Sequence, residues 1–168
     1  IRQQIGDKKG EIATLNNISQ IFRLREDYDE ALEYLEDAMI ICEEIGDLAG
    51  KGVMLNNISA IYQAQDNYVA ALHYLSESIQ IREQLGDTVG LCRTKFNMGH
   101  IYAKNGKLYK ALESWVESYS IAKQKNIAEI LLALAGLGPQ VGLPKGLAGW
   151  ERLAQIKQEK GGEGGAEG

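Results

Sequence analysis

Three asparagines spaced forty residues apart are the side chains in this 168-residue sequence whose chemistry best suits binding of another polypeptide. Asn17, Asn57 and Asn97 each lie in a similar local sequence, and Asn16 and Asn56 precede the first two. A carboxamide carries one acceptor and two donors in a plane, so it can bond the N–H and C=O groups of one extended residue whatever its side chain. Such a set would recognise backbone rather than side chains.

Residues that could support catalysis or bind metal do not form a recognisable set. His73 and His100 have no neighbouring Asp or Cys motif, and Cys42 and Cys92 lie fifty residues apart without metal-ligand spacing. Two cysteines also do not make a disulfide framework. We therefore expect buried, reduced thiols, no metal, no cofactor and no enzymatic activity.

Composition excludes several classes of protein. A chain that is 45% hydrophobic can bury a core, and its net charge of −5 is the wrong sign for a nucleic-acid binder. The longest apolar stretch, residues 130–137, falls far short of the roughly 20 residues that cross a bilayer, and no export signal precedes it. Both prolines follow residue 138. We expect an almost entirely helical, cytoplasmic protein that binds neither nucleic acid nor membrane.

A forty-residue repeat organises the chain. The dipeptide Gly-Asp occurs at positions 6–7, 46–47 and 86–87, and the sequence 15–19 recurs at 55–59 and more loosely at 95–99. Each forty-residue repeat is predicted to form two helices. Gly can close one helix in the left-handed conformation while Asp caps the next, with further breaks before Tyr28 and Tyr68 and at Asn105-Gly106. The predicted helices cover about residues 8–25, 28–45, 48–65, 68–85, 88–105 and 108–124.

Residue size also follows the repeat. Small side chains recur where the paired helices must approach closely, and bulky ones fill the spaces between them. The small positions are Ser19, Ser59 and Gly99 on the first helices, then Ala31, Ala71, Ala111, Ala38, Ser78 and Ser118 on the second helices. Asp27 or Asn67 is the expected N-cap of a second helix, with Glu30 completing a capping box after Asp27.

This pattern resembles the tetratricopeptide repeat. The family signature Trp-x-x-Leu-Gly-x-x-Tyr and Ala-x-x-x-Phe is matched by Leu15-x-x-Ile18-Ser19-x-x-Phe22 and Ala31-x-x-x-Leu35-x-x-Ala38. The forty-residue period and the Gly-Asp ending are similar to the longer-helix variant of kinesin light chains, spindle-orientation adaptors and bacterial multi-repeat proteins. The resemblance covers about residues 1–125 and implies an all-α, right-handed solenoid of antiparallel helix pairs.

The repeat also suggests a domain organisation. Residues 1–4 match residues 81–84, so we expect residues 1–6 to be the end of a truncated preceding repeat, with more repeats upstream in a longer parent chain. Repeats then occupy residues 7–46, 47–86 and 87–125. Residues 126–160 should form C-terminal capping helices, one of them amphipathic with Leu147, Trp150, Leu153, Ala154 and Ile156. Residues 161–168 read as a flexible, Gly-rich tail.

The resemblance implies that first helices line a concave groove. Their positions turned away from the core are then candidates for peptide contact. The set is Asn16, Asn17, Gln20, Arg23, Asn56, Asn57, Gln63, Arg93, Phe96, Asn97, His100 and Lys104. The alternative is that the asparagines serve local helix packing. The two-lysine carboxylate clamp of chaperone-binding relatives is not matched, because Leu24 and Ala64 stand at its second positions.

Charge refines the expected partner. Arg23, Arg93, Lys104 and two further candidates, Lys95 and Arg25, would make the groove the basic part of an acidic chain, whereas Glu33, Glu36, Glu43 and Glu44 belong to outer helices. We therefore expect a ligand that is acidic or has a free C-terminal carboxylate. The leading hypothesis is a non-enzymatic adaptor or scaffold that binds an extended peptide. The alternatives are self-assembly by end-to-end stacking of repeats, and a regulatory or sensory region of a larger signalling protein.

Overall fold

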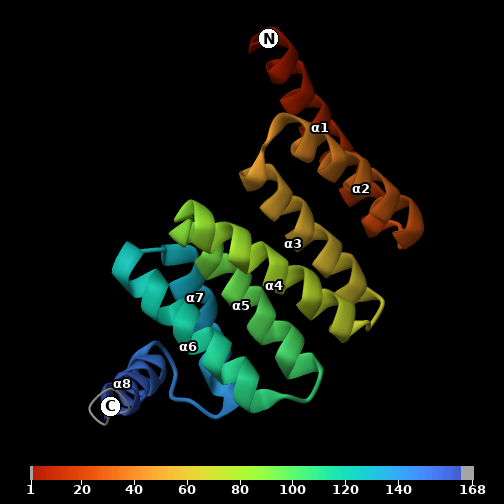
Figure 1. Ribbon diagram of the computed structural model, residues 1–168. Helices are drawn as coiled ribbons and strands as arrows, with labels where there is room; N and C mark the ends of the chain where they lie inside the picture. Colours follow the sequence, from red (N-terminus) through yellow and green to blue (C-terminus); the bar gives the residue numbers. More distant parts are fainter. Residues whose placement is uncertain (1, 164–168) are drawn as a thin grey trace. The chain divides into compact units, whose positions relative to one another are not determined.

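A computed structural model describes the backbone of residues 2–163 and the side chains of residues 7–159. In this part of the chain, regular structure is entirely helical (Figure 1). The helices are α1 (Arg2–Leu24), α2 (Tyr28–Ile45), α3 (Leu48–Ala64), α4 (Tyr68–Leu85), α5 (Thr88–Lys104), α6 (Leu108–Lys125), α7 (Ala128–Leu137), the 3₁₀ helix η1 (Gly138–Val141) and α8 (Ala148–Glu163). No helix among these residues is both long enough and apolar enough to cross a membrane.

The chain forms two compact units. Unit 1 comprises residues 1–87 with α1 to α4, and unit 2 comprises residues 88–168 with α5 to α8. Successive helices pack as antiparallel pairs, α1 with α2, α3 with α4, and α5 with α6 (Figure 1). Within unit 1, α3 also packs against α2, and within unit 2 both α7 and α8 pack against α6. The predicted all-α class built from sequential helix pairs is confirmed.

Glycine and a capping residue end one helix and begin the next, as the repeat predicts. Gly46 and Gly86 adopt the left-handed conformation with φ of +70° and +65°. The Asp47 carboxylate then accepts a hydrogen bond from the Gly50 N–H at 2.9 Å. Asn67 caps α4 in the same way through the Ala70 N–H at 3.1 Å. The left-handed glycine satisfies the last carbonyls of one helix while the cap satisfies the first N–H groups of the next.

Two features predicted at helix boundaries are not formed. Asp27 occupies the N-cap position of α2 but makes no side-chain cap, so the capping box with Glu30 is absent. Asp29 and Glu30 already place negative charge at the first turn, which reduces what a capping carboxylate would add. The expected break at Gly6-Asp7 is also wrong, because α1 continues through it. One glycine costs a helix only about 1 kcal/mol, so Gly6 alone does not end it.

Small side chains lie at the contacts between paired helices. Ala31 and Ala38 of α2 are fully buried and pack with Leu35, Ile58 and Ile61 in the core of unit 1. Their counterparts in the other repeats, together with Ser19, Ser59, Ser78 and Ser118, are buried too. Both cysteines are also buried and unpaired, Cys42 in unit 1 and Cys92 in unit 2. The predicted alternation of small and large residues is confirmed.

Unit 2 closes its core with helices that lie outside the repeat pattern. Trp150 of α8 is fully buried, packs edge-on against Trp115 of α6 with ring centroids 6.2 Å apart, and donates its indole N–H to the Leu134 carbonyl of α7 at 2.7 Å. Ala154 is buried as predicted, whereas Ile156 remains 40% exposed. Of the expected tail, residues 161–163 belong to α8 and residues 164–168 lie outside the described part of the chain.

A glycine and a tryptophan replace a serine and a leucine at the close contact in the third repeat. Gly99 stands where the other repeats have Ser19 and Ser59, and Trp115 stands in the column of Leu35 and Leu75. A Cβ atom built on Gly99 would lie 2.7 Å from Cε2 of Trp115, well inside van der Waals contact. The Trp115 indole N–H donates to the Phe96 carbonyl at 3.1 Å, which holds the ring against α5. The larger ring therefore requires glycine opposite it.

The first prediction tests this close contact. Gly99→Ala should lower the free energy of unfolding of unit 2 by about 1–3 kcal/mol, because the added methyl group forces the Trp115 ring to move. Both tryptophans of the chain lie in unit 2, so denaturant unfolding followed by tryptophan fluorescence reports on this unit. The matched control is Gly136→Ala in α7, where a Cβ meets no atom within 4 Å. An equal loss in both variants would contradict the interpretation.

Candidate functional site

Two of the predicted amides of unit 1, Asn16 and Asn57, meet at the first helices. The Asn57 side chain of α3 donates its Nδ2–H to Oδ1 of Asn16 in α1, at 2.5 Å. Asn16 and Asn57 are half-buried, and Asn17 next to them is exposed. The bond fixes the orientation of both amide planes across two successive first helices. It leaves Oδ1 of Asn57 and Nδ2 of Asn16 without a hydrogen bond to any residue that the structure describes.

Asn56 is a packing residue, which corrects the prediction that it faces a groove. Its Nδ2 donates to Oγ of Ser78 at 2.6 Å and to the Gly52 carbonyl at 3.0 Å. Ser78 is fully buried on α4 and itself donates to the Gly52 carbonyl at 2.9 Å. One step along a helix turns a side chain by about 100°, so Asn56 and Asn57 point to different neighbours. Local packing within the helix pair therefore accounts for the position of Asn56 but not for that of Asn57.

The remaining candidates of unit 1 are accessible polar side chains. Arg23 and Gln20 lie one turn apart on α1, and Nε of Arg23 donates to Oε1 of Gln20 at 3.0 Å. Both side chains are half-buried, as is Gln63 on α3. Arg23 forms no ion pair with a residue in the described ranges. Its positive charge therefore remains available to a ligand.

The candidates on α5 in unit 2 divide into exposed and packed residues. Asn97, Arg93 and Lys104 are exposed. The guanidinium of Arg93 donates to the Glu129 carboxylate of α7 at 3.0 Å, so its charge is already partly balanced. Phe96 and His100 are half-buried. The two rings pack edge to face with centroids 4.6 Å apart, and Phe96 contacts the hydrophobic core of unit 2.

His100 lies between two aromatic rings. Its imidazole is 4.6 Å from the Phe96 ring and 5.2 Å from the Trp115 ring, measured between centroids. Burial lowers the pKa of His100 below its ordinary value, and the nearby positive charge of Lys104 lowers it further. His100 is therefore a neutral packing residue near neutral pH rather than a second cation beside Lys104.

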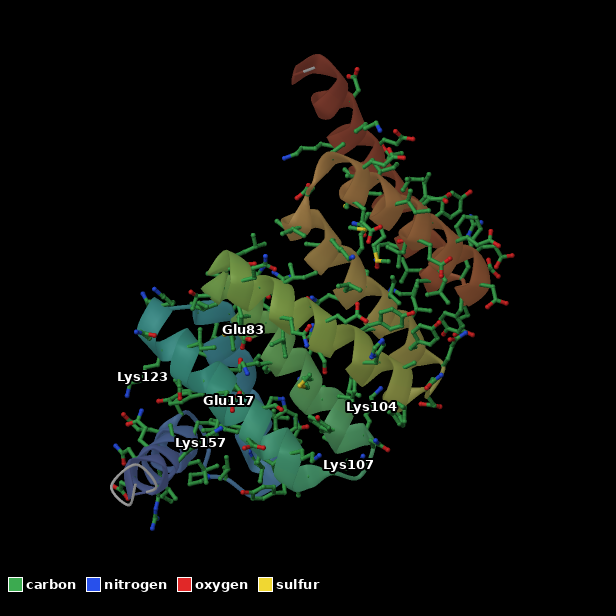
Figure 2. The ribbon with its side chains drawn as sticks, in the orientation of Figure 1. Glu83, Lys104, Lys107, Glu117, Lys123 and Lys157 are labelled. Atoms are coloured by element: carbon green, nitrogen blue, oxygen red, sulfur yellow. The ribbon has the colours of Figure 1, made fainter. Side chains whose placement is uncertain are left out.

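Lys95 does not face the first-helix surface, which corrects the expectation that it contributes to a basic groove. Its Nζ contacts Oε2 of Glu117 on α6 at 2.6 Å. Glu117 also receives Lys157 of α8 at 2.5 Å, and Figure 2 shows these two labelled side chains next to each other. Burial by itself would raise the pKa of Glu117, but the hydrogen bonds from Lys157 and Lys95 outweigh it and hold the pKa below its ordinary value.

Several hollows of unit 2 lie beside α8, where the repeat pattern does not reach, and another lies between α5 and α6. One of those beside α8, of about 330 Å³, is bordered mainly by apolar side chains, and the others beside α8 have both polar and apolar borders. The apolar residues at the first are Tyr109, Leu112, Val116, Leu153 and Ile156. The amphipathic pattern of residues 147–160 predicts a helix from sequence, but it does not predict that this helix packs against α6. Among the side chains that the structure describes, those of residues 7–159, no cluster of His, Cys, Asp and Glu could hold a metal ion.

The chain matches the family model described as tetratricopeptide repeat over residues 10–84 and again over residues 50–124. A comparison with curated proteins found no match. Several solved structures resemble this chain in fold, at sequence identities so low that the likeness concerns the fold alone. The TPR domain of Arabidopsis FLU has a TM-score of 0.63 at 18% identity, covering 70% of this chain and 98% of that domain.

Two longer proteins resemble the chain in fold. BtubC (BKLC) from P. vanneervenii has a TM-score of 0.66 at 16% identity, covering 90% of this chain and 65% of its own. Aspartyl phosphate phosphatase F from Bacillus subtilis has a TM-score of 0.65 at 20% identity. The match covers 71% of this chain but only 32% of the phosphatase. The present chain thus spans just under two thirds of the first protein and about a third of the second.

The second prediction separates packing asparagines from accessible ones. Asn56→Ala should lower the free energy of unfolding by about 1 kcal/mol, because the buried Ser78 hydroxyl and the Gly52 carbonyl lose a donor. Asn17→Ala, at an exposed position of α1, should change it by no more than about 0.5 kcal/mol. Chemical denaturation followed by far-UV circular dichroism measures both. A larger loss for Asn17→Ala than for Asn56→Ala would reverse the assignment.

The third prediction concerns pH. The folded pKa of His100 is lower than its unfolded value of about 6.5, so between those two values the unfolded chain binds more protons than the folded one. The free energy of unfolding of unit 2 should therefore fall as pH drops below about 6.5, until the folded pKa is reached. His100→Gln should remove this dependence in fluorescence-monitored unfolding. His73→Gln, at an exposed position of α4 in unit 1, is the control and should leave it intact.

Proposed function

Since the match covers most of its length, the chain belongs to the tetratricopeptide repeat family, and we propose that its first helices bind an extended peptide. Modules of this family generally mediate protein–protein interaction and are typically non-catalytic. The present chain would accordingly act as an adaptor or scaffold rather than as an enzyme. The finer assignment, to an extended peptide held by first helices, rests on the side chains that α1 and α3 expose in unit 1 and that α5 exposes in unit 2.

The observation that carries the proposal is the Asn16–Asn57 pair. Its bond ties the amides of two successive first helices in one orientation, and Nδ2 of Asn16 and Oδ1 of Asn57 have no hydrogen-bond partner among the described residues. A peptide unit offers the complementary acceptor and donor. Because the amides are already held by each other and by their helices, binding would cost less side-chain entropy than with freely rotating residues.

Repeat spacing sets the length of the ligand. Neighbouring packed helices lie about 8–10 Å apart, while an extended chain advances about 3.3 Å per residue. Each repeat would therefore serve roughly three ligand residues. Three repeats would suit a peptide of about eight to ten residues.

The available cations favour an acidic ligand. Arg23 on α1 and Lys104 on α5 carry positive charges without a carboxylate partner among the described residues, whereas Arg93 is paired with Glu129. A ligand with acidic residues, or with a free C-terminal carboxylate, would gain hydrogen-bonded charge contacts at these positions. Field complementarity of this kind would mainly raise the association rate and the specificity.

Self-association is the second candidate function, and the exposure of Ile21 favours it. This side chain of α1 is 50% exposed, although its counterparts Ile61 and Ile101 are buried. The surface that is buried in the second and third repeats is open in the first, where the second helix of a preceding repeat would also pack. It could take a helix from another molecule.

The fourth prediction tests peptide binding. An array of random ten-residue peptides should yield binders that are rich in Asp and Glu, and Asn57→Ala with Asn97→Ala should weaken the best of them about tenfold or more. The matched control is Gln80→Ala with Gln124→Ala, which removes two exposed carboxamides from the second helices α4 and α6. Fluorescence anisotropy of labelled peptides measures both affinities. Equal affinity in all three proteins would exclude the asparagines as the binding residues.

A further inference from the structure

Eight asparagines occur in the chain, and the structure holds the backbone after each of them differently. An asparagine loses its side-chain amide most readily when the backbone nitrogen of the next residue can reach its side-chain carbonyl carbon. Five of the eight lie inside α1, α3 and α5, where the regular helix holds that nitrogen in a hydrogen bond. Helix ends open most easily, so we expect the reaction among the three asparagines located there, which are Asn67, Asn105 and Asn126.

Two of these three asparagines are protected by their surroundings. Oδ1 of Asn67 accepts a hydrogen bond from the Ala70 N–H at 3.1 Å as the cap of α4, which holds the side chain in place. Asn126 ends α6 in the left-handed conformation, with φ of +54°, and is followed by Ile127. The β-branched side chain of Ile127 crowds the backbone nitrogen that would have to attack. Neither asparagine is therefore well placed to react.

Asn105 is followed by glycine in the turn between α5 and α6. Its side chain is half-buried and makes no hydrogen bond to a residue that the structure describes, and Gly106 is exposed. The Gly106 N–H donates to the Ala103 carbonyl at 3.0 Å. The Lys107 N–H donates to the Tyr102 carbonyl at 2.8 Å. The reaction needs only these terminal bonds to open, and no side chain on Gly106 then blocks its nitrogen.

The turn itself does not require this dipeptide. At the position of Gly106, the first two repeats have Glu26 and Asp66 in the same left-handed conformation, with φ of +65° and +57°. At the position of Asn105, the second repeat has Gln65, whose longer side chain forms a cyclic imide far more slowly. The third repeat thus combines two residues that the fold can replace, and their joint chemistry distinguishes this turn.

Unpaired lysines surround the turn. Lys104 and Lys107, both labelled in Figure 2, and Lys110 on α6 are exposed, and none of them forms an ion pair with a residue in the described ranges. The sequence has no Asp or Glu between positions 88 and 112. Nearby positive charge favours the deprotonated form of a group. The attacking species is the deprotonated backbone nitrogen of Gly106, so the lysines favour the reaction.

We propose that Asn105 is a site of spontaneous covalent modification, at which the chain converts its own asparagine to aspartate and isoaspartate. The Gly106 nitrogen gives its proton to a base in solution and bonds to Cγ of Asn105. The Cγ–Nδ2 bond breaks, and the amide leaves as ammonia after taking a proton from water. A second water molecule then opens the resulting succinimide at either of its carbonyls. Both products place a carboxylate between Lys104 and Lys107.

Peptide mass spectrometry of the unaltered protein, incubated at mildly alkaline pH in water labelled with heavy oxygen, tests the site. Residue 105 should be the first asparagine to show the mass of an acid, with one heavy oxygen, and both aspartate and isoaspartate should form. The inference is independent of peptide binding, because it is measured on the protein alone. Earlier conversion of Asn126 or any other asparagine, or aspartate without isoaspartate at residue 105, would overturn it.

Two variants borrow residues from the second repeat, so the turn keeps a sequence that this fold already accepts. Asn105→Gln should abolish the mass change at residue 105. Gly106→Asp should slow it severalfold, because the side chain shields the nitrogen and the carboxylate opposes its deprotonation. If Gly106→Asp converts as fast as the unaltered protein, the backbone nitrogen is not the attacking group and the proposal is wrong.

The contribution of the lysines is tested separately. Lys104→Gln with Lys107→Gln should slow the conversion severalfold. The matched control is Lys123→Gln with Lys125→Gln, which removes two charges beside Asn126 at the other end of α6 and should leave the rate at residue 105 unchanged. Equal rates in both double variants would exclude a local effect of charge.

The isoaspartate product should weaken the α5–α6 pair, because it adds one carbon to the main chain of a tight turn. Protein converted at residue 105 can be separated by ion exchange into its two products and unfolded in denaturant while tryptophan fluorescence is followed. Asn105→Asp is the matched control, since it has the same charge and a normal backbone. The isoaspartate form should unfold at a lower denaturant concentration than this variant. Identical unfolding would contradict the assignment of this turn as a structural joint of unit 2.

Discussion

The close approach of paired helices is the constraint on which the rest of this structure depends. Serine or glycine on the first helix and alanine on the second let the two backbones come together, and every such position is fully or almost fully buried. The rule is strict enough that a tryptophan at position 115 coincides with glycine at position 99, where a Cβ would collide with the ring. Compact pairing commits one face of each helix to its partner. It thereby determines which side chains remain for binding.

Pairing also explains why neighbouring asparagines have different roles. Asn56 faces the partner helix and hydrogen-bonds Ser78, whereas Asn57 faces the preceding first helix and bonds Asn16. The first bond holds a repeat together, and the second joins two repeats and still leaves polar groups available. A side chain that contributes to stacking can thus also contribute to recognition, because an amide has more hydrogen-bonding groups than one neighbour uses.

The repeat made the helices predictable to within one or two residues between positions 28 and 125, because glycine and the capping residues recur in register. It could not predict contacts made by helices outside the period. Lys95 stands where the other repeats have Leu15 and Leu55. Its long side chain nevertheless reaches Glu117, which Lys157 of α8 also binds. The prediction that Asn56 faces a groove was wrong for a related reason, since sequence spacing gives the direction of a side chain only approximately. The accessible candidates, such as Asn17 and Asn97, were those whose surroundings were set by the repeat alone.

The same dependence on neighbours accounts for the apolar side chains that α1 and α8 leave exposed. In a stack, each helix pair buries apolar surface against the pairs before and after it. The α1 face keeps Ile21 and Leu24 instead of polar residues. On α8, Trp150 and Ala154 are buried, but Ile156 in the next turn lies beside an open hollow. Exposed aliphatic residues on an otherwise charged surface mark places where a further protein surface can pack.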